Sequence, residues 1–407
     1  MNILIISQYF WPENFRINDL ALGLGERGNK VTVLTGIPNY PEGRFFPGYG
    51  IFKRNREEYE GVRIVRIPVV PRGRGGALRL IINYISFTVN ACLLAPFLLR
   101  SKFDIIYFSL SPLTEGIPAL VMKKMKKIPI VFWVQDLWPE SLSATGIVTS
   151  SLALKAVEKM VRFLYLRCDR ILVQSRAFIP VIEKRGGDAK RIAYFPNSAE
   201  ELYRPVSVEP DAPERKNIPE GFCVMFAGNI GAAQDFETIL SAAEQLKEYD
   251  DIHWVIVGDG RLRPWVEAQI EERGLTKTLH LLGRHPMELM PRFFSIADVM
   301  LVTLKKEYIF SLTIPSKVQS YLACAKPIIA AIDGEGAGII EEAGAGIVCP
   351  AENPHALAEV VLKISRMPKA DLQDMGLRGR SYFEKHFERN VLIDRLHNWI
   401  KELKKEE

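Results

Sequence analysis

Residues 2–14 read NILIISQYFWPEN, and residues 222–240 read FCVMFAGNIGAAQDFETIL. Each stretch starts with a run of apolar residues, passes through a turn and leads into a segment of helix length. Similar short apolar runs recur through both halves of the chain and alternate with helix-length segments. Strands that are apolar throughout are typical of a parallel sheet that helices cover on both faces. The sequence therefore predicts an α/β fold that starts again in the second half.

The apolar runs give the expected strands directly. In the first half they are residues 3–6, 31–34, 64–70, 105–108, 130–134 and 171–173, with helices expected at 15–28, 79–100, 112–126 and 151–167. In the second half they are residues 222–227, 254–257, 280–282, 299–304, 328–331 and 347–349.

This alternation predicts two doubly wound, Rossmann-like domains, 1–197 and 198–380, facing a central cleft. Residues 196–220 are rich in proline and charge and poor in apolar periodicity, as expected of a linker. The last segment, 381–407, should form a helix whose apolar face docks back on the N-terminal domain. Ligands of such sheets bind beyond the carboxyl ends of the strands. We therefore expect the loop 8–19 to line the cleft.

Composition excludes several classes of protein. The chain has 407 residues and a formal net charge of +5, which does not indicate a nucleic-acid-binding tail. Its five cysteines are scattered without a C-x-x-C pair, so we expect neither a disulfide framework nor a metal site. We expect a reducing, cytoplasmic compartment instead. The N-terminus lacks a basic region and a small-residue cleavage site, and predicts a strand instead of a signal peptide. No Ser-His-Asp or Cys-His set is apparent.

One segment has an unusual composition: residues 80–99 hold no charge and nearly reach the length that spans a bilayer. Three alternatives stay open, namely a buried helix, a spanning helix that would interrupt the alternation, and a helix lying on a membrane surface. The third would make the protein peripheral on an anionic membrane. Its basic contacts would be Arg72, Arg74 and Arg79, with Arg100 at the far end and a second patch at Lys123, Lys124, Lys126 and Lys127.

The stretch SLTIPSKVQSYLACAKPII, residues 311–329, predicts the start of a helix. Thr313 is a suitable N-cap and Pro315 suits the first turn, with Ser316 and Lys317 following. Free backbone N–H groups, the positive end of the helix dipole and a lysine charge together suit a diphosphate. The alternative is a plain capped helix with a surface lysine.

Three further loops of the second domain follow expected strands. Gly228 and Gly231, on either side of Asn229, allow a ligand phosphate to approach the backbone closely. The loops 258–265 and 282–286 add Arg261 and Arg284. Taken together, these loops favour a nucleotide diphosphate.

The stretch WVQDLWPESL, residues 133–142, follows a strand of the first domain. Asp136 and Glu140 fall at that strand's carboxyl end, where a carboxylate can orient a hydroxyl group or stabilise positive charge. They are the expected catalytic residues. Asp136 could instead cap the next helix.

A family resemblance accompanies these motifs. In order, the chain reads YFWPEN, LGERGNKVTVLT, TGIPNYPEG, VQDLWPESL, FPN, AGNIGAAQ, VGDG, IPSKVQSYLA and AKPII. Over nearly its whole length this resembles bacterial family-4 glycosyltransferases. Within that family it is most similar to O-antigen and capsule enzymes described as N-acetyl-L-fucosaminyl transferases.

The resemblance implies a GT-B fold, a UDP-sugar donor in the C-terminal domain and a polyprenyl-diphosphate-linked acceptor in the N-terminal one. It also implies transfer with retention, with no cofactor and no required metal. In the family the loop after the first strand reaches toward the donor, which gives Asn14 and Arg16 that role. Two alternatives stay open: a UDP-sugar 2-epimerase of the same fold and a non-catalytic nucleotide-binding protein.

The chain departs from the family at several positions. Leu312 and Ser320 stand where many relatives carry two glutamates that contact the donor sugar and ribose. Asn229 and Gln234 replace a usual Lys/Arg pair, and Asp136 replaces a common histidine. The expected counterions of the diphosphate are therefore Lys317, Arg261 and Arg284.

Overall fold

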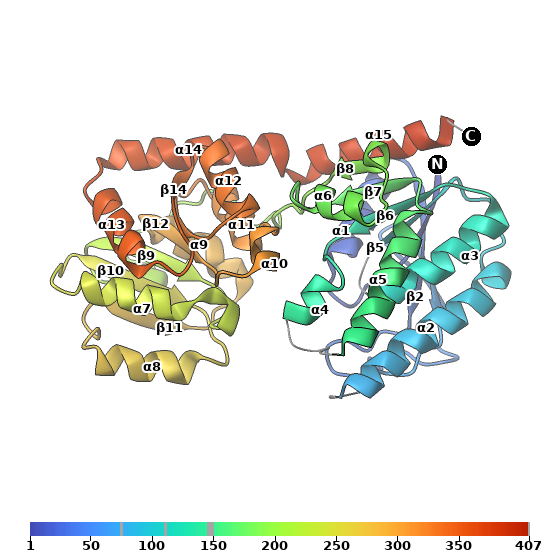
Figure 1. The fold of residues 1–407 in the computed structure, drawn as a ribbon, viewed down its shortest axis with the longest axis horizontal. Helices are drawn as coiled ribbons and strands as arrows, with labels where there is room; N and C mark the ends of the chain where they lie inside the picture. The colour runs from blue at the N-terminus through green and yellow to red at the C-terminus, as the bar shows by residue number, and fades with distance from the viewer. Residues whose placement is uncertain (74–75, 110–111, 145–149, 406–407) are drawn as a thin grey trace. The chain divides into compact units, whose positions relative to one another are not determined.

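The computed structural model describes residues 1–73, 76–109, 112–144 and 150–405, which divide into two compact units (Figure 1). The first unit comprises Met1–Phe195 and Leu392–Glu407, and the second comprises Pro196–Val391. The sequence placed the division at 197/198. Arg74, one of the expected membrane contacts, lies outside the described residues.

An eight-stranded sheet forms the centre of the first unit as far as it is described, in the order β3-β4-β2-β1-β5-β6-β7-β8. Neighbouring strands are parallel except for β3, which runs antiparallel to β4. The central β5 and β6 are buried along their whole length, as a parallel sheet covered on both faces requires. The strands are β1 Asn2–Ile6, β2 Lys30–Gly36, β3 Arg56–Tyr59, β4 Val62–Ile67, β5 Ile105–Ser109, β6 Ile130–Val134, β7 Arg170–Val173 and β8 Ile192–Tyr194.

The second unit holds a six-stranded parallel sheet in its described part, in the order β11-β10-β9-β12-β13-β14. The order reverses between β9 and β12, and such a switch point is where doubly wound sheets bind ligands. The strands are β9 Phe222–Ala227, β10 Ile252–Val257, β11 Leu279–Gly283, β12 Val299–Thr303, β13 Ile328–Ala331 and β14 Gly346–Cys349.

Helices pack against both sheets, and their apolar faces join buried strand residues in a hydrophobic cluster of each unit. Those of the first unit are α1 Arg16–Glu26, α2 Ala77–Leu98, α3 Gly116–Lys126, α4 Glu140–Ala144, α5 Ser151–Tyr165, α6 Phe178–Lys184 and most of α15 Arg389–Lys405. Those of the second unit are α7 Phe236–Gln245, α8 Arg263–Glu272, α9 Met290–Ile296, α10 Tyr308–Ser311, α11 Ser316–Ala323, α12 Glu335–Glu342, α13 Pro354–Ser365 and α14 Lys369–His386. The predicted α/β fold with two doubly wound sheets is confirmed.

The sequence missed the two outer strands of the first sheet. β3 reads REEY and alternates between exposed and half-buried residues, so it offers no apolar run. Arg66 of β4 donates hydrogen bonds to Glu57 of β3, and this ion pair joins the two strands. β8 is only three residues long and half-buried.

The expected linker 196–220 is not a free connection, because it packs on the second unit. The Tyr203 ring stacks on Phe294, with 5.8 Å between centroids. The buried Glu214 pairs with Arg292 at 2.6 Å. Only a few side chains of this polar, proline-rich stretch make these contacts. They form no periodic apolar pattern, so the sequence did not reveal the packing.

The expected C-terminal helix docks on the first unit as predicted, but it is shorter than 381–407, because the chain is interrupted at Phe387 between α14 and α15. Phe387 is fully buried, and the chain passes from the second unit to the first between residues 391 and 392. The apolar side chains of α15 that join the core of the first unit are Leu392, Ile393, Leu396, Ile400 and Leu403.

The loop that follows β1 packs on the loop that follows β2. The carboxylate of Glu13 is buried, and its Oε1 accepts hydrogen bonds from the backbone N–H groups of Asn39 and Tyr40, both at 2.7 Å. Burial raises the pKa of Glu13 to about 7, against the opposing effect of these two donors. Both polar loops of the sequence, WPEN and IPNYP, therefore lie at the same edge of the first sheet.

Helix α2 places two asparagine side chains toward the first unit and seven large apolar side chains toward the outside. Asn83 is fully buried, and its side chain accepts a hydrogen bond from Gln8 Nε2 and donates one to the Val70 carbonyl oxygen, both at 2.6 Å. The Asn90 amide donates to the Pro68 carbonyl oxygen at 2.8 Å. The large apolar side chains instead face outward, at Leu78, Ile81, Ile82, Ile85, Val89, Leu93 and Phe97.

We call these seven residues the α2 stripe. By length and composition, α2 is the one helix among the described residues that could cross a membrane, which is weak evidence by itself. Asn83, Phe87, Ala91 and Ala95 are fully buried against the first unit, so one face of the helix belongs to the core. Of the three alternatives, a wholly buried helix is inconsistent with the exposed stripe.

Candidate functional site

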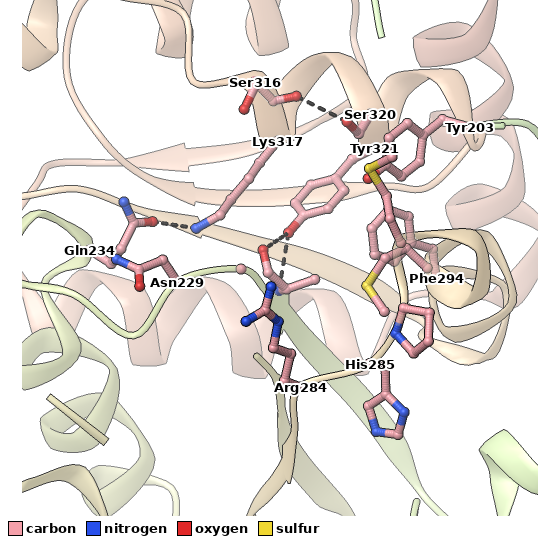
Figure 2. Close-up of a pocket in the computed structure, with 15 residues that line it drawn as sticks. Tyr203, Asn229, Gln234, Arg284, His285, Phe294, Ser316, Lys317, Ser320 and Tyr321 are labelled. Carbon is pink, nitrogen blue, oxygen red and sulfur yellow. Dashed lines mark hydrogen bonds between the residues drawn. The ribbon is translucent and has the colours of Figure 1, made fainter. Parts of the chain in front are cut away.

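A hollow of about 800 Å³ lies at the carboxyl edge of the second sheet (Figure 2), a size typical of small-molecule sites. It adjoins a second hollow of about 620 Å³, with which it shares Gly228, Asn229, Arg284, His285 and Met290. The larger hollow is also lined by Tyr203, Ala227, Gln234, Pro286, Met287, Phe294, Ser316, Lys317, Ser320 and Tyr321.

Glycine is required where the loop after β9 passes the hollow. Gly228 has φ +144°, and a Cβ there would lie 2.6 Å from Lys317 Cε. Gly258, with φ +154°, would place a Cβ 1.8 Å from the Gly228 carbonyl oxygen. A side chain at Gly258 would displace the backbone of Gly228, and one at Gly228 would displace the Lys317 side chain, so both glycines allow the loops to lie close to the lysine.

Lys317 places its ammonium group in a poorly solvated position. Nζ lies 3.7 Å from the centroid of the Phe226 ring and donates a hydrogen bond to Gln234 Oε1 (Figure 2). Burial lowers the pKa of Lys317 to about 7. An anion beside Nζ would favour the charged form and would therefore bind together with a proton.

The helix that carries Lys317 starts later than the sequence suggested. α11 begins at Ser316, so the N-cap position is Pro315. The proline side chain makes no capping hydrogen bond. The predicted capping role of Thr313 is wrong, because its hydroxyl donates to the Phe310 carbonyl oxygen at 3.1 Å. Without a side-chain cap, the first backbone N–H groups of α11 keep their capacity to bind an anion.

The structure brings together some of the predicted donor residues and leaves others apart. Gly228, Asn229, Arg284, Ser316 and Lys317 all line the larger hollow. Among the described residues that line it, the charged groups are the cations Arg284 and Lys317, with no carboxylate. Gly231 lies in the adjacent turn, where a Cβ would be 2.3 Å from Asn229 Nδ2. The predicted donor residues of the second unit that lie outside both linings are Gly231, Arg261, Thr313 and Pro315.

Sequence reasoning missed the aromatic wall of the hollow. Tyr203 stacks on Phe294, and Phe294 meets Tyr321 edge to face with 5.1 Å between centroids. The hydroxyl of Tyr321 donates to the Ala227 carbonyl oxygen at 3.3 Å and so ties α11 to the end of β9. The only sequence signal for Tyr203 was its place in a stretch interpreted as a linker.

Ser320 occupies the position of an expected ribose-binding glutamate. Its hydroxyl donates to the Ser316 carbonyl oxygen at 3.1 Å, within α11. A hydroxyl satisfied by its own helix is a weaker acceptor for a ligand than a carboxylate.

In the first unit the two predicted catalytic carboxylates have different surroundings. Asp136 is exposed just beyond the end of β6. It does not cap α4, because that helix begins four residues later, at Glu140. Glu140 forms an ion pair with Arg185, which also donates to the Trp138 carbonyl oxygen at 3.4 Å. Asp136 is thus accessible to a substrate, whereas Glu140 already has a partner.

The remaining predicted residues of the first unit lie around α1 and α3. Asn14 is exposed, and Arg16 is the first residue of α1. Lys123 does not belong to an exposed basic patch, because its ammonium pairs with Asp169 at 2.6 Å. Lys124 is exposed beside it. Within the described ranges, no group of three or more His, Cys, Asp or Glu side chains could hold a metal ion.

Two doubly wound sheets and a cation-lined hollow at the switch point of the second define a GT-B architecture, and comparisons with known proteins agree. The glycosyl transferase 4-like domain matches residues 14–198, and the glycosyl transferases group 1 domain matches residues 209–381. The two matches follow one another and together span most of the chain. This protein therefore belongs to the glycosyltransferases of the GT-B fold.

Two curated relatives are glycosyltransferases by name. The chain is 32% identical to the probable glycosyltransferase WbjE of Pseudomonas aeruginosa over 272 residues, 65% of this chain and 66% of the relative. It is 23% identical to the putative colanic acid biosynthesis glycosyl transferase WcaI of Escherichia coli K12 over 340 residues, 79% and 81% of the two chains.

Solved structures share the fold at low sequence identity. Sucrose-phosphate synthase from Thermosynechococcus elongatus superposes with a TM-score of 0.76 at 16% identity and covers 100% of both chains. HepE of Anabaena, solved in complex with UDP, superposes with a TM-score of 0.70 at 15% identity, covering 99% of this chain and 100% of the other.

The position of Lys317 predicts proton-coupled binding of a diphosphate. Above pH 7 the lysine of the unliganded protein is mostly neutral, and a diphosphate restores its charge. With UDP as the probe, affinity should fall as pH rises above 7, and binding at pH 8 should take up nearly one proton. Lys317→Met should weaken binding by about ten- to a hundredfold, because a charge-assisted contact contributes roughly 1.5–3 kcal/mol.

Calorimetry in buffers of different ionisation enthalpy measures both effects. Lys305→Met, at an exposed lysine of the same unit, is the matched control and should behave like wild type. Proton uptake that persists in Lys317→Met would contradict the assignment.

Proposed function

We propose that this protein transfers a sugar from a UDP-sugar to a polyprenyl-diphosphate-linked saccharide during the synthesis of a bacterial surface polysaccharide. Binding of a UDP-sugar donor is supported mainly by one observation: Lys317, Arg284 and the uncapped start of α11 lie around one hollow. The names of WbjE and WcaI support a role in polysaccharide synthesis, and the UDP complex of HepE supports the nucleotide. N-acetyl-L-fucosamine is the proposed sugar, from the family resemblance.

In this proposal the second unit acts on the leaving group. As the glycosidic bond to the diphosphate breaks, negative charge grows on the β-phosphate. Lys317, Arg284 and the N–H groups of α11 stabilise this charge without reorganisation, because the fold already holds them in place. The departing diphosphate accepts the proton of the acceptor hydroxyl on the same face of the sugar. The product would then keep the anomeric configuration of the donor, and no metal would be required.

Lipid-dependent release of UDP tests the function. Purified protein incubated with a panel of labelled UDP-sugars should release UDP only when a bacterial lipid extract is present, and label should enter the lipid fraction. Lys305→Met serves again as the matched control. An interconverted UDP-sugar would identify an epimerase, and UDP binding without turnover would identify a non-catalytic binder. Either result would refute the proposed transfer.

Asp136 is proposed to orient the acceptor hydroxyl or to support the positively charged transition state. Asp136→Asn should lower turnover by about a hundredfold or more, a usual effect of a positioned acid or base. UDP affinity and melting temperature should stay near wild type, because the side chain is exposed and lies outside the donor hollow. Glu183→Gln, at an exposed carboxylate of the same unit, is the control. Full activity in a folded Asp136→Asn protein would remove Asp136 from the mechanism.

The α2 stripe supports a peripheral position on the cytoplasmic face of the bacterial membrane. Seven exposed apolar side chains on one helix face suit the boundary between head groups and acyl chains. Arg72, Arg79 and Lys124 supply charge for anionic lipids, each contributing about 1 kcal/mol near such a surface. The helix would lie along the bilayer, because its other face is part of the core.

Vesicle sedimentation tests this position. Anionic vesicles should capture the protein at low salt, part of it should stay bound at high salt through the stripe, and neutral vesicles should capture less. An Ile85→Ser/Leu93→Ser variant should lose the salt-resistant part. Leu377→Ser, at an exposed leucine of α14, should not. Protein that remains in the supernatant with anionic vesicles at low salt would show that the stripe does not bind membranes.

A further inference from the structure

An aromatic cluster lies where the loops after β1 and β2 meet. The rings of Tyr9 and Phe15 stack at 5.1 Å between centroids, and Phe15 lies 5.2 Å from Tyr40. Tyr9 is buried, whereas Tyr40 is 37% exposed, so the cluster presents one ring outward. An amphipathic ring of this kind can pack on the apolar face of a sugar while its hydroxyl meets water.

One arginine lies over the exposed ring, and a second contacts the segment that carries the first. The guanidinium of Arg72 lies 4.9 Å from the centroid of Tyr40, and the backbone N–H of Arg72 donates to Asn39 Oδ1 at 3.0 Å. Arg79, in the first turn of α2, uses Nε to donate to the Pro71 carbonyl oxygen at 3.1 Å. Among the described residues neither arginine is in an ion pair. Two guanidinium groups without a carboxylate partner supply the charge and the hydrogen-bond donors that a diphosphate requires.

The loops that hold these residues are fixed in place. Asn39 sits between Glu13 and Arg72, since the carboxylate accepts from its N–H and its own Oδ1 accepts from Arg72. Gly73 donates to the Gly43 carbonyl oxygen at 3.0 Å, and a Cβ at Gly43 would meet that same backbone at 2.0 Å. These contacts hold in place the backbone segments that carry Tyr40 and Arg72.

The α2 stripe begins directly beside the arginines. Leu78 precedes Arg79 and is 72% exposed, and the stripe continues to Phe97. Leu78 and Phe97 are nineteen positions apart in the helix, which corresponds to about 28 Å at roughly 1.5 Å per residue. Along the surface of the first unit the order is thus aromatic ring, cationic pair, apolar stripe. A lipid-linked sugar has the same order of sugar, diphosphate and hydrocarbon.

We propose that Tyr40, Arg72 and Arg79 form the acceptor site, with Tyr40 against the first sugar and the arginines on the diphosphate. The hydrocarbon chain then leaves along the α2 stripe into the membrane. This inference rests on the proposed transferase function and adds to it the residues that recognise a lipid diphosphate. It also separates Arg72 and Arg79 from a general attraction to anionic head groups, for which any exposed cation near the stripe would serve.

Arg100 provides the control for that distinction. It is exposed just beyond the C-terminal end of α2, beside the stripe but far along the helix from the ring. Loss of its charge should weaken attraction to an anionic surface as much as loss of one of the other arginines. It should leave a diphosphate site at the other end unchanged.

Calorimetry with farnesyl diphosphate, a soluble short-chain probe without a sugar, tests the site apart from catalysis. Arg72→Gln/Arg79→Gln should lower its affinity by at least about tenfold, whereas Arg100→Gln should bind as wild type does. Farnesyl monophosphate should bind wild type more weakly than the diphosphate. An equal loss in Arg100→Gln, no loss in the double variant, or no binding by wild type would each overturn the proposal.

A second measurement covers the sugar contact and the dependence on the proposed function. With sugar-bearing lipid extract, Tyr40→Leu should raise KM, whereas Tyr40→Phe, which keeps the ring, should not; equal KM values would overturn the contact. If no UDP-sugar and lipid pair turns over but farnesyl diphosphate binds as described, the transferase function fails while the lipid-diphosphate site stands.

Discussion

Parallel strands buried on both faces restrict where this protein can place polar chemistry. The interior of each sheet is mostly apolar, so most charges, amides and flexible glycines of the candidate sites gather where the strands end. In the second unit that edge holds Lys317 beside Gly228. In the first it holds Glu13, Tyr40 and Asp136, in the loops that follow β1, β2 and β6. In both units the polar groups of the candidate sites therefore lie on loops that follow parallel strands.

The distribution of polar and apolar side chains on α2 also follows from the polar groups that gather at the strand ends. The loops at the edge of the first sheet have buried carbonyl groups and amides that need partners, and Asn83 and Asn90 supply them from the inner face of the helix. Asn83, Phe87 and two alanines occupy the inner face, and the seven residues of the α2 stripe remain outside. Such a surface has a lower free energy in an apolar environment, as the proposed membrane position would provide, than in water.

The sequence predicted the elements whose burial is uniform and missed those held by single contacts. Every strand that is apolar along its length was found, and the glycine loop and Lys317 were expected together because parallel strands end at a common edge. β3 escaped because an ion pair holds it to its neighbour. Tyr203 and Glu13 escaped because stacking on Phe294 and hydrogen bonds to a distant loop leave no pattern along the chain. The start of α11 was predicted too early, because threonine is a common N-cap residue. The Thr313 hydroxyl instead donates a hydrogen bond to the carbonyl oxygen of Phe310, which precedes it in the chain.

The return of α15 to the first unit affects how the chain acquires its structure during synthesis. Leu396 and Ile400 are completely buried in a core whose other members, such as Ile3 and Val31, come from the beginning of the chain. The ribosome makes these two groups almost four hundred residues apart, so the first unit must wait, with part of its core open, until the last helix emerges. The second unit, contiguous in sequence, has no such delay. Although it is synthesised later, it is the part that can complete its fold first.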